Sequence, residues 1–243
     1  MELKGLVAIV TGAGKGIGKT IAEKFGEEGA KVALWDFDMT CFAGVSSSPD
    51  RLIQQVNVRN EDESVAAVER VVKEFGRIDV LVNNAGISRH KPIEEMTLDL
   101  WNEVIDTNLK GVFLCCKAVI PIMKKQKRGK IVNIASLGAR TGRPGVGINY
   151  AASKAGVIAI TQTLAREVGP TGIYVNAIAP GPILTEQTKQ YPPEVFATWN
   201  VGRAIPKDGL PEDVAEGAIF LASKRSDWVT GITLDLNGGI FIP

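Results

Sequence analysis

The chain has 243 residues, enough to bury a full core, and we expect one domain over residues 1–243. Its 28 Lys and Arg nearly balance 27 Asp and Glu, so a net charge of +1 gives no field that would gather nucleic acid or an anionic membrane. No apolar run approaches the roughly 20 residues that span a bilayer, and residues 6–10 are too short for a signal peptide, so we expect a cytoplasmic protein.

Cysteine and histidine are scarce. Three cysteines and one histidine cannot build a disulfide framework or a typical zinc site, so we expect no metal. A histidine-centred catalytic triad is disfavoured for the same reason. The function should therefore lie in a pocket that uses other side chains.

A glycine-rich turn follows the first predicted strand. The apolar run at residues 6–10 has the length of a buried strand, and residues 11–18 follow it before a helix begins. Gly12, Gly16 and Gly18 would allow a tight turn and a close approach of backbone to a pyrophosphate. Their spacing differs from the usual Gly-x-Gly-x-x-Gly fingerprint, but the position between strand and helix favours a phosphate-binding turn.

The second strand, residues 31–36, ends in an acid. Asp36 would bind the adenosine ribose hydroxyls of a dinucleotide and repel a 2′-phosphate. Lys15, inside the glycine turn, argues the other way because a cation could meet that phosphate. We weight Asp36 more and predict NAD, with NADP as the less favoured cofactor. Residues 39–50 contain Gly44 and Pro49 and predict only a short or broken helix.

Strands and helices alternate along the rest of the chain. A third strand at residues 52–58 precedes a helix opened by Asn60, and a fourth strand at 78–82 ends in Asn83-Asn84-Ala85-Gly86. This alternation predicts an α/β fold, a single doubly wound Rossmann-type domain with a mostly parallel seven-stranded sheet and helices on both faces. Ligands of such sheets bind at the carboxyl ends of the strands, where Asn57 and Asn83 would lie.

The later elements follow the same alternation. We expect a long helix over residues 98–127, kinked or divided at Pro121, and a basic run at 124–130 that is a solvated helix end. The remaining expected elements are strands at 130–135, 173–178 and 233–236, a helix at 150–168 and a last helix that opens at 211–213.

Tyr150 and Lys154 lie four residues apart on a predicted helix and so share one face. A fixed cation beside a phenol favours the phenolate and should move its pKa from about 10 toward neutrality. Tyr150 could then exchange a proton with a substrate oxygen. Ser136, at the end of its strand, could hydrogen-bond the same oxygen.

Five motifs in register carry a resemblance that covers essentially the whole chain. The motifs are Thr11-Gly12-x-x-x-Gly16-Ile17-Gly18, Asn83-Asn84-Ala85-Gly86, Ser136, Tyr150-x-x-x-Lys154 and Pro180-Gly181. Together they resemble the classical short-chain dehydrogenase/reductase family. The resemblance implies a homotetrameric or dimeric, nicotinamide-dependent oxidoreductase of secondary alcohols and ketones, whose subunits pack through the two long helices.

The resemblance also assigns roles by position. It implies that Asn108 holds a proton-relay water, that Lys154 bonds the nicotinamide ribose, and that Ile183 and Thr185 contact the carboxamide. The expected catalytic residues are Asn108, Ser136, Tyr150 and Lys154. The expected cofactor-binding residues are Gly12, Lys15, Gly16, Ile17, Gly18, Asp36, Asn57, Val58, Asn84, Ala85, Gly86, Tyr150, Lys154, Pro180, Gly181, Ile183 and Thr185.

The substrate is the least determined feature. Residues 186–210 show no clear strand and suit a substrate lid. One alternative is a reductase of 3-oxoacyl groups on acyl carrier protein, for which residues 124–130 could supply positive charge. Pro170-Thr171 stands where we expect such reductases to place an arginine, and Asp36 favours NAD, so we favour a small polyol, sugar or cyclic alcohol.

The side chains expected to enclose that substrate are Arg140, Arg143, Tyr191 and Trp199. Two rivals remain. A nicotinamide-binding sensor without catalysis would need only the glycine turn and Asp36. A sugar-nucleotide epimerase or dehydratase can also use Tyr-x-x-x-Lys, but usually needs a longer chain.

Overall fold

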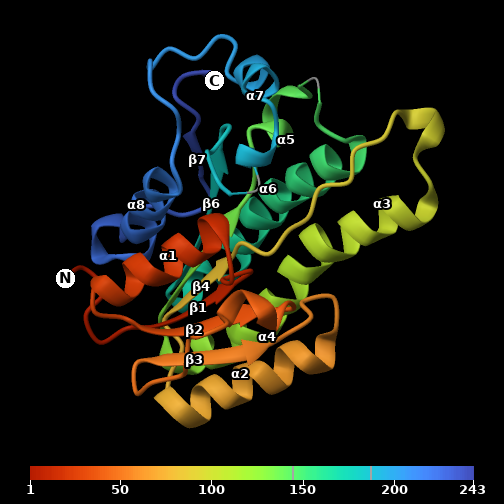
Figure 1. Cartoon of the computed structure of the whole chain (residues 1–243). Coiled ribbons are helices and arrows are strands. Elements are labelled where there is room, and N and C mark those ends of the chain that lie inside the picture. Colours follow the sequence, from red (N-terminus) through yellow and green to blue (C-terminus); the bar gives the residue numbers. More distant parts are fainter. Residues whose placement is uncertain (144, 187) are drawn as a thin grey trace.

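The computed structural model describes residues 1–143, 145–186 and 188–243 (Figure 1). Seven strands form one sheet in the order β3-β2-β1-β4-β5-β6-β7, and every neighbouring pair is parallel. The strands are β1 (Val7–Thr11), β2 (Lys31–Asp36), β3 (Arg51–Gln55), β4 (Val80–Asn83), β5 (Gly129–Ile134), β6 (Ile173–Pro180) and β7 (Thr233–Leu236). The predicted doubly wound α/β fold is confirmed.

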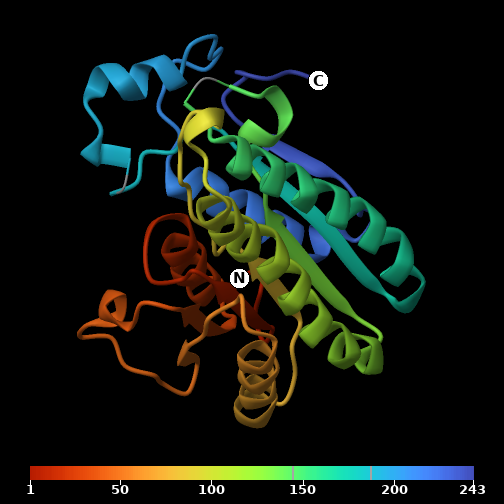
Figure 2. The same ribbon diagram turned by 90° about the vertical axis from the view of Figure 1, so that its right-hand side faces the viewer.

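Helices cover both faces of the sheet, as Figures 1 and 2 show. Helices α1 (Gly16–Glu27) and α8 (Pro211–Ala222) pack on one face. Helices α2 (Glu61–Phe75), α4 (Gly111–Gln126) and α6 (Ile148–Val168) pack on the other. The shorter helices are α3 (Leu98–Ile105), α5 (Gly138–Thr141) and α7 (Pro193–Trp199).

Alternating side chains of each strand feed two separate cores. In β1, Val7 and Ile9 join the core under α2, α4 and α6, whereas Ala8 and Val10 join the core under α1 and α8. Successive side chains of a strand point to opposite faces, so a strand covered on both faces must be apolar throughout. This is why the inner strands read as continuous apolar runs.

One predicted strand boundary is wrong by more than two residues. Strand β3 ends at Gln55 rather than at residue 58, and the next residues turn toward α2, where the Asn57 amide donates to a Glu63 carboxylate oxygen (2.8 Å). The other predicted strands are off by no more than two residues at either end. The short helix expected within 39–50 is a single 3₁₀ turn, Met39–Phe42, as predicted.

The helix predicted over residues 98–127 is divided, but not at Pro121. A π-helical turn, Asp106–Lys110, separates α3 from α4, and Pro121 lies inside an unbroken α4. Pro121 has no N–H to donate to the carbonyl of Lys117, one turn earlier in the helix. Both residues are exposed, so water can bind that carbonyl instead. The π turn instead places the buried Asn108 toward the carboxyl end of the sheet.

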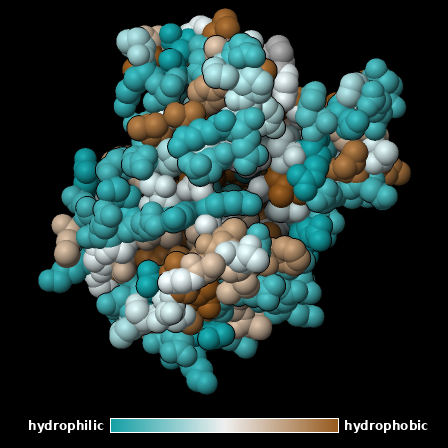
Figure 3. Space-filling model, in the orientation of Figure 1, coloured by the Kyte–Doolittle hydropathy of each residue, from teal (hydrophilic) through white to brown (hydrophobic). Residues whose placement is uncertain are grey.

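No helix in the described ranges is both apolar and long enough to cross a membrane. Hydrophilic residues cover most of the face in Figure 3, with apolar residues scattered among them.

The turn between β1 and α1 packs against the residue that follows β4. The Asn84 side chain donates to the carbonyl oxygens of Thr11 and Gly12, both at 3.0 Å. A methyl group on Gly18 would lie 2.1 Å from the Gly12 oxygen and 2.3 Å from the Asn84 amide nitrogen. Gly12 and Gly16 adopt positive φ angles of 63° and 55°. The predicted tight glycine turn is therefore present.

Gly18→Ala should destabilise the protein by about 1–3 kcal/mol, because backbone would have to move to admit the methyl group. Gly26→Ala, on the same helix, is the matched control, since nothing lies within 4 Å of its added methyl group. That change should be neutral or stabilising by up to about 1 kcal/mol. Urea unfolding of both variants measures the difference, and equal stabilities would contradict the packing described above.

Candidate active site

Most of the predicted site residues meet at the carboxyl edge of the sheet. The glycine turn follows β1, Asp36 ends β2, Asn84 follows β4, Ser136 follows β5 and Pro180 ends β6. All these strands run in the same direction, so their carboxyl ends share one edge.

The amino end of α1 is open to an anion. Lys15 occupies the position before the helix, no side chain caps the helix there, and its first turn contains no acid. Unpartnered N–H groups and the helix dipole suit a phosphate group. Thr185 covers the turn, because its Cγ2 would lie 3.7 Å from a methyl group on Gly16. These residues fit the pyrophosphate of a dinucleotide.

Asp36 is held in place by main-chain donors. The Gly14 amide donates to Oδ2 at 2.9 Å, and the Asp38 amide donates to Oδ1 at 3.0 Å. Each carboxylate oxygen can accept a further bond, so both remain available to the two hydroxyls of a ribose.

Val58 and Ala85, two of the predicted cofactor-binding residues, also make contacts within the fold. The Val58 side chain packs on Gly111 at the start of α4, where an added methyl group would lie 2.9 Å away. The Ala85 amide donates to the Thr11 hydroxyl oxygen at 3.0 Å. These contacts hold the segments that follow β3 and β4 against α4 and β1.

Lys154 is a buried ammonium, 3% exposed, that donates to the carbonyl oxygen of Ile134 at 2.7 Å. Burial lowers the pKa of Lys154 to about 8, so it keeps its proton at neutral pH. Its Nζ lies 5.9 Å from the centroid of the Tyr150 ring. Gly86 leaves room beside it, since an added methyl group there would come within 3.4 Å of Nζ.

The expected direction of the Tyr150 pKa shift is wrong for this structure. Burial raises the pKa of Tyr150, and a hydrogen bond with Ser136 only partly opposes that rise. The Lys154 ammonium lies beside the ring and donates to the Ile134 carbonyl oxygen. It therefore does not lower the pKa of the phenol. Tyr150 is therefore protonated at neutral pH. Its hydroxyl can donate a proton, and Ser136, fixed by the Gly138 amide (3.0 Å), lies within its reach.

Asn108 uses its side chain to join two parts of the site. Its amide nitrogen donates to the Ile87 carbonyl oxygen (2.9 Å) and the Ser153 hydroxyl (3.1 Å), and its oxygen accepts from the Ile87 amide (2.8 Å). Ser153 in turn donates to the Tyr150 carbonyl oxygen at 2.7 Å. Asn108 thus ties the segment after β4 to the first turn of α6.

Two residues that hold Tyr150 were missed from the sequence, Ser153 and Asn149. Asn149 is fully buried, accepts from the Tyr150 amide at 2.8 Å and donates to the Leu100 carbonyl oxygen at 3.1 Å. An asparagine in the first turn of a helix is a weak signal, because it could equally be a cap. Only the position of α3 shows that it joins two helices.

The four side chains expected to enclose a substrate do not lie together. Tyr191 and Trp199 are in edge-to-face contact, with centroids 5.0 Å apart, and Arg143 donates to the Trp199 carbonyl oxygen. Arg140 lies elsewhere: it pairs with Asp235 at 3.2 Å and covers the Phe241 ring at 4.9 Å. Figure 1 shows α7 beside α5 at one end of the sheet. The expectation that Arg140 lines the substrate pocket together with Arg143, Tyr191 and Trp199 is therefore wrong.

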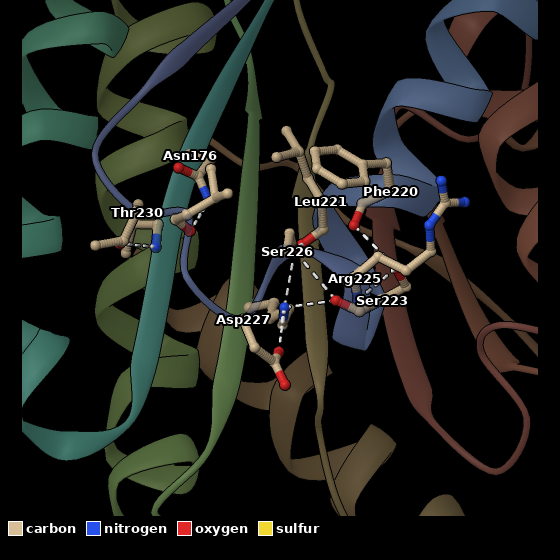
Figure 4. Close-up of polar contacts among 11 residues, drawn as sticks. Asn176, Phe220, Leu221, Ser223, Arg225, Ser226, Asp227 and Thr230 are labelled. Atoms are coloured by element: carbon tan, nitrogen blue, oxygen red, sulfur yellow. Dashed lines mark hydrogen bonds and ion pairs between the residues drawn. The ribbon is translucent and has the colours of Figure 1, made fainter.

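The basic run at residues 124–130 lies at the amino edge of the sheet, opposite the candidate site. The run leads into the start of β5, whereas Ser136 follows the end of that strand. Arg128 pairs with the buried Asp79 at 3.2 Å. Lys130 pairs with Asp227 at 2.8 Å and donates to the Ser226 hydroxyl at 2.8 Å, in the cluster drawn in Figure 4. Part of the positive charge in this run is therefore neutralised within the fold.

Among the described residues, no three His, Cys, Asp or Glu side chains gather in a way that could hold a metal ion. Burial raises the pKa of the Cys115 and Cys116 thiols to about 12, so both stay protonated where α4 packs on the sheet.

Comparisons with known proteins agree on one family. A family model described as enoyl-(acyl carrier protein) reductase matches residues 12–240. The chain is 42% identical over 247 residues to 3-oxoacyl-(acyl-carrier-protein) reductase FabG of Thermotoga maritima, with 100% of both chains covered. The protein of that name from Chlamydia muridarum is 42% identical over 241 residues, with 96% of each chain covered.

A solved structure described as the crystal structure of gox2181 superposes with a TM-score of 0.92 at 34% identity, covering 98% of this chain and 96% of that one. The motifs, the sheet order and these end-to-end matches lead to the same conclusion: this chain belongs to the short-chain dehydrogenase/reductase family.

Proposed function

We propose that the protein reduces the 3-oxo group of an acyl chain carried on acyl carrier protein to a 3-hydroxy group. The observation that carries this proposal is the end-to-end match, at 42% identity, to 3-oxoacyl-(acyl-carrier-protein) reductases of two different bacteria. The polyol, sugar or cyclic alcohol expected from the sequence finds no support among these relatives, so we replace that expectation.

The protonation of the site suits reduction. A bound reduced nicotinamide would supply the hydride that adds to the carbonyl carbon. As negative charge develops on the carbonyl oxygen, the protonated Tyr150 donates its proton to it and Ser136 hydrogen-bonds it. Because Tyr150 is protonated at neutral pH, it is in the form that the reduction step needs.

Lys154 and Asn108 support that step. The Lys154 ammonium keeps its charge below about pH 8, and two of its N–H groups remain beyond the bond to Ile134, enough to hold a nicotinamide ribose and a water. The Asn108 side chain is occupied by Ile87 and Ser153, so a relay water would bind its main chain. Both residues thereby help to replace the proton that Tyr150 gives up.

The cofactor we propose is NAD(H) in preference to NADP(H). The fixed Asp36 carboxylate can accept both ribose hydroxyls and would repel a 2′-phosphate. Residues 186–210, which include the Tyr191–Trp199 contact, would form a lid over the acyl chain.

A second subunit would contribute to docking of the acidic carrier protein. Lys124, Lys125 and Lys127 are exposed, but they lie at the edge of the sheet away from Tyr150. In the proposed homotetramer or dimer, antiparallel packing of α4 and α6 about a two-fold axis would bring this edge of one copy toward the site of the other. This arrangement would add positive charge from a second copy to the site of the first.

A matched assay tests the proposal. Oxidation of NADH and of NADPH is followed with a 3-oxoacyl chain on acyl carrier protein, and reduction of NAD with polyols, sugars and cyclic alcohols. We expect the carrier-bound thioester to be turned over at least about 100-fold faster than any free ketone or alcohol. A free alcohol or ketone that equalled the thioester would overturn the substrate, and a higher kcat/KM with NADPH would overturn the cofactor preference.

Tyr150→Phe should lower turnover by about 10²–10⁴-fold, the usual contribution of a general acid. Cofactor binding should change little, because the ring is kept and only the hydroxyl is lost. Nucleotide affinity by calorimetry serves as the control alongside the rate. Near-normal turnover in this variant would remove Tyr150 from the mechanism.

The kcat/KM for reduction should fall above about pH 8, because the free enzyme loses the proton of Lys154 there. In Lys154→Arg the cation persists at high pH, so the descending limb should move up by more than one unit even if the rate is lower throughout. A limb at the same pH in both proteins would assign it to another group.

A further inference from the structure

The proposed lid, residues 186–210, leaves and rejoins the fold at one place. Ile183 and Gly209 form a parallel bridge there, and the Leu184 amide donates to the Gly209 carbonyl oxygen at 2.8 Å. The lid contains α7, all of whose residues the structure describes, and Phe196 is the buried one. The rest of α7 is at least partly exposed, so few side chains hold this helix in place.

Arg143 holds α7 from outside the lid. Its guanidinium donates to the Trp199 carbonyl oxygen at the carboxyl end of α7, where a cation also suits the helix dipole. Among the described residues, no other hydrogen bond joins α7 to the protein outside residues 186–210. Arg143 is half-buried, so little water competes for this bond.

The segment between α5 and α6 borders both Ser136 and α7. A methyl group on Gly138 would lie 3.0 Å from the Val146 Cγ1 and 3.4 Å from the Ser136 Oγ. A methyl group on Gly145 would lie 3.4 Å from the Trp199 Nε1. The same short segment therefore adjoins the hydroxyl that would hold the substrate oxygen and the helix that belongs to the lid.

Three aromatic rings gather at this end of the lid. The Trp199 ring is in edge-to-face contact with Tyr191, with centroids 5.0 Å apart, and with Phe196, with centroids 5.8 Å apart. These contacts tie Tyr191 and Phe196 to the position of Trp199. An apolar surface of this kind favours binding of an acyl chain roughly fourfold for each methylene that it removes from water.

We propose that Arg143 is a positioning residue that sets selectivity for the length of the acyl chain. Through its bond to the Trp199 carbonyl oxygen, Arg143 holds α7 against the segment beside Ser136, so that the three rings cover the distal part of a long acyl chain. A short acyl chain does not reach the rings and gains nothing from the bond. The inference rests on the 3-oxoacyl substrate of the proposed function, and one of its two tests does not use that substrate.

Two substitutions separate the hydrogen bond of Arg143 from its bulk. Arg143→Met keeps an unbranched apolar stem but cannot donate, whereas Arg143→Lys keeps a charged donor. Arg70→Met is the matched control, because it makes the same change at an exposed position on α2. Reduction of 3-oxobutanoyl and of 3-oxodecanoyl groups on acyl carrier protein is measured for each protein.

Arg143→Met should raise KM for the 3-oxodecanoyl substrate about tenfold, the effect of losing one charged hydrogen bond. KM for the 3-oxobutanoyl substrate, and kcat for both, should change less than about twofold. Arg143→Lys should recover most of the selectivity, and Arg70→Met should match the wild type. In Trp199→Leu, which keeps the carbonyl but removes the indole ring, Arg143→Met should add less than about twofold to KM for the long chain.

Limited proteolysis tests the position of α7 without a substrate. Lys189 is exposed in the lid, and trypsin can cut after it only when the lid opens locally. We expect cleavage after Lys189 to be at least about fivefold faster in Arg143→Met than in the wild type or Arg70→Met. Arg143→Lys should lie between them, and fragment masses identify the cleavage site.

Equal KM changes for the two chain lengths in Arg143→Met, or unchanged cleavage after Lys189, would overturn the proposal. If Arg143→Met melted at a lower temperature, the ratio of the two KM values would still decide, because general loosening of the fold affects both substrates alike. A wild type that reduced neither carrier-bound substrate would refute the proposed function, while the cleavage rates would still test Arg143.

Discussion

The bond from the Lys154 ammonium to the Ile134 carbonyl oxygen is the interaction on which the site depends. It joins α6 to the carboxyl end of β5, so it sets the distance between Tyr150 on the helix and Ser136 just beyond the strand. Burying an ammonium is costly, and the lowering of the Lys154 pKa to about 8 reflects that cost. A neutral side chain could join the two elements, but it would not carry the charge that the proposed contact with a nicotinamide ribose uses.

Buried amides hold the frame around that bond. Asn133 accepts from the Asn83 amide at 2.8 Å and donates to the Thr161 hydroxyl at 2.9 Å, which fixes β4, β5 and α6 to one another beneath the site. Above it, Asn108 and Ser153 connect the segment after β4 to Tyr150. Buried hydrogen-bond networks of this kind rigidify a core when nearly all their members are satisfied.

The sequence was informative where a property is local. The glycine turn, the inner strands and the caps of α2 and α8 follow from residue type and spacing, and their positions were predicted closely. Three features depend on distant contacts and were not predictable: the π turn at Asn108, the partner of Arg140 and the direction of the Tyr150 pKa shift. The spacing of Tyr150 and Lys154 predicts that they share a face, but not that the ammonium bonds Ile134.

The charged residues of the scaffold and those of the candidate site are held by different kinds of partner. At the amino edge, ions meet ions: Asp79 pairs with Arg77 and Arg128, and Lys130 pairs with Asp227. At the carboxyl edge Arg140 also pairs with Asp235, but Asp36 is held by amides and Lys154 by a carbonyl, so these two site residues are fixed in place without an ion-pair partner. A charge that is held only by main-chain dipoles can still attract a ligand of opposite charge. A charge that is paired with an opposite charge in the protein attracts a ligand much less.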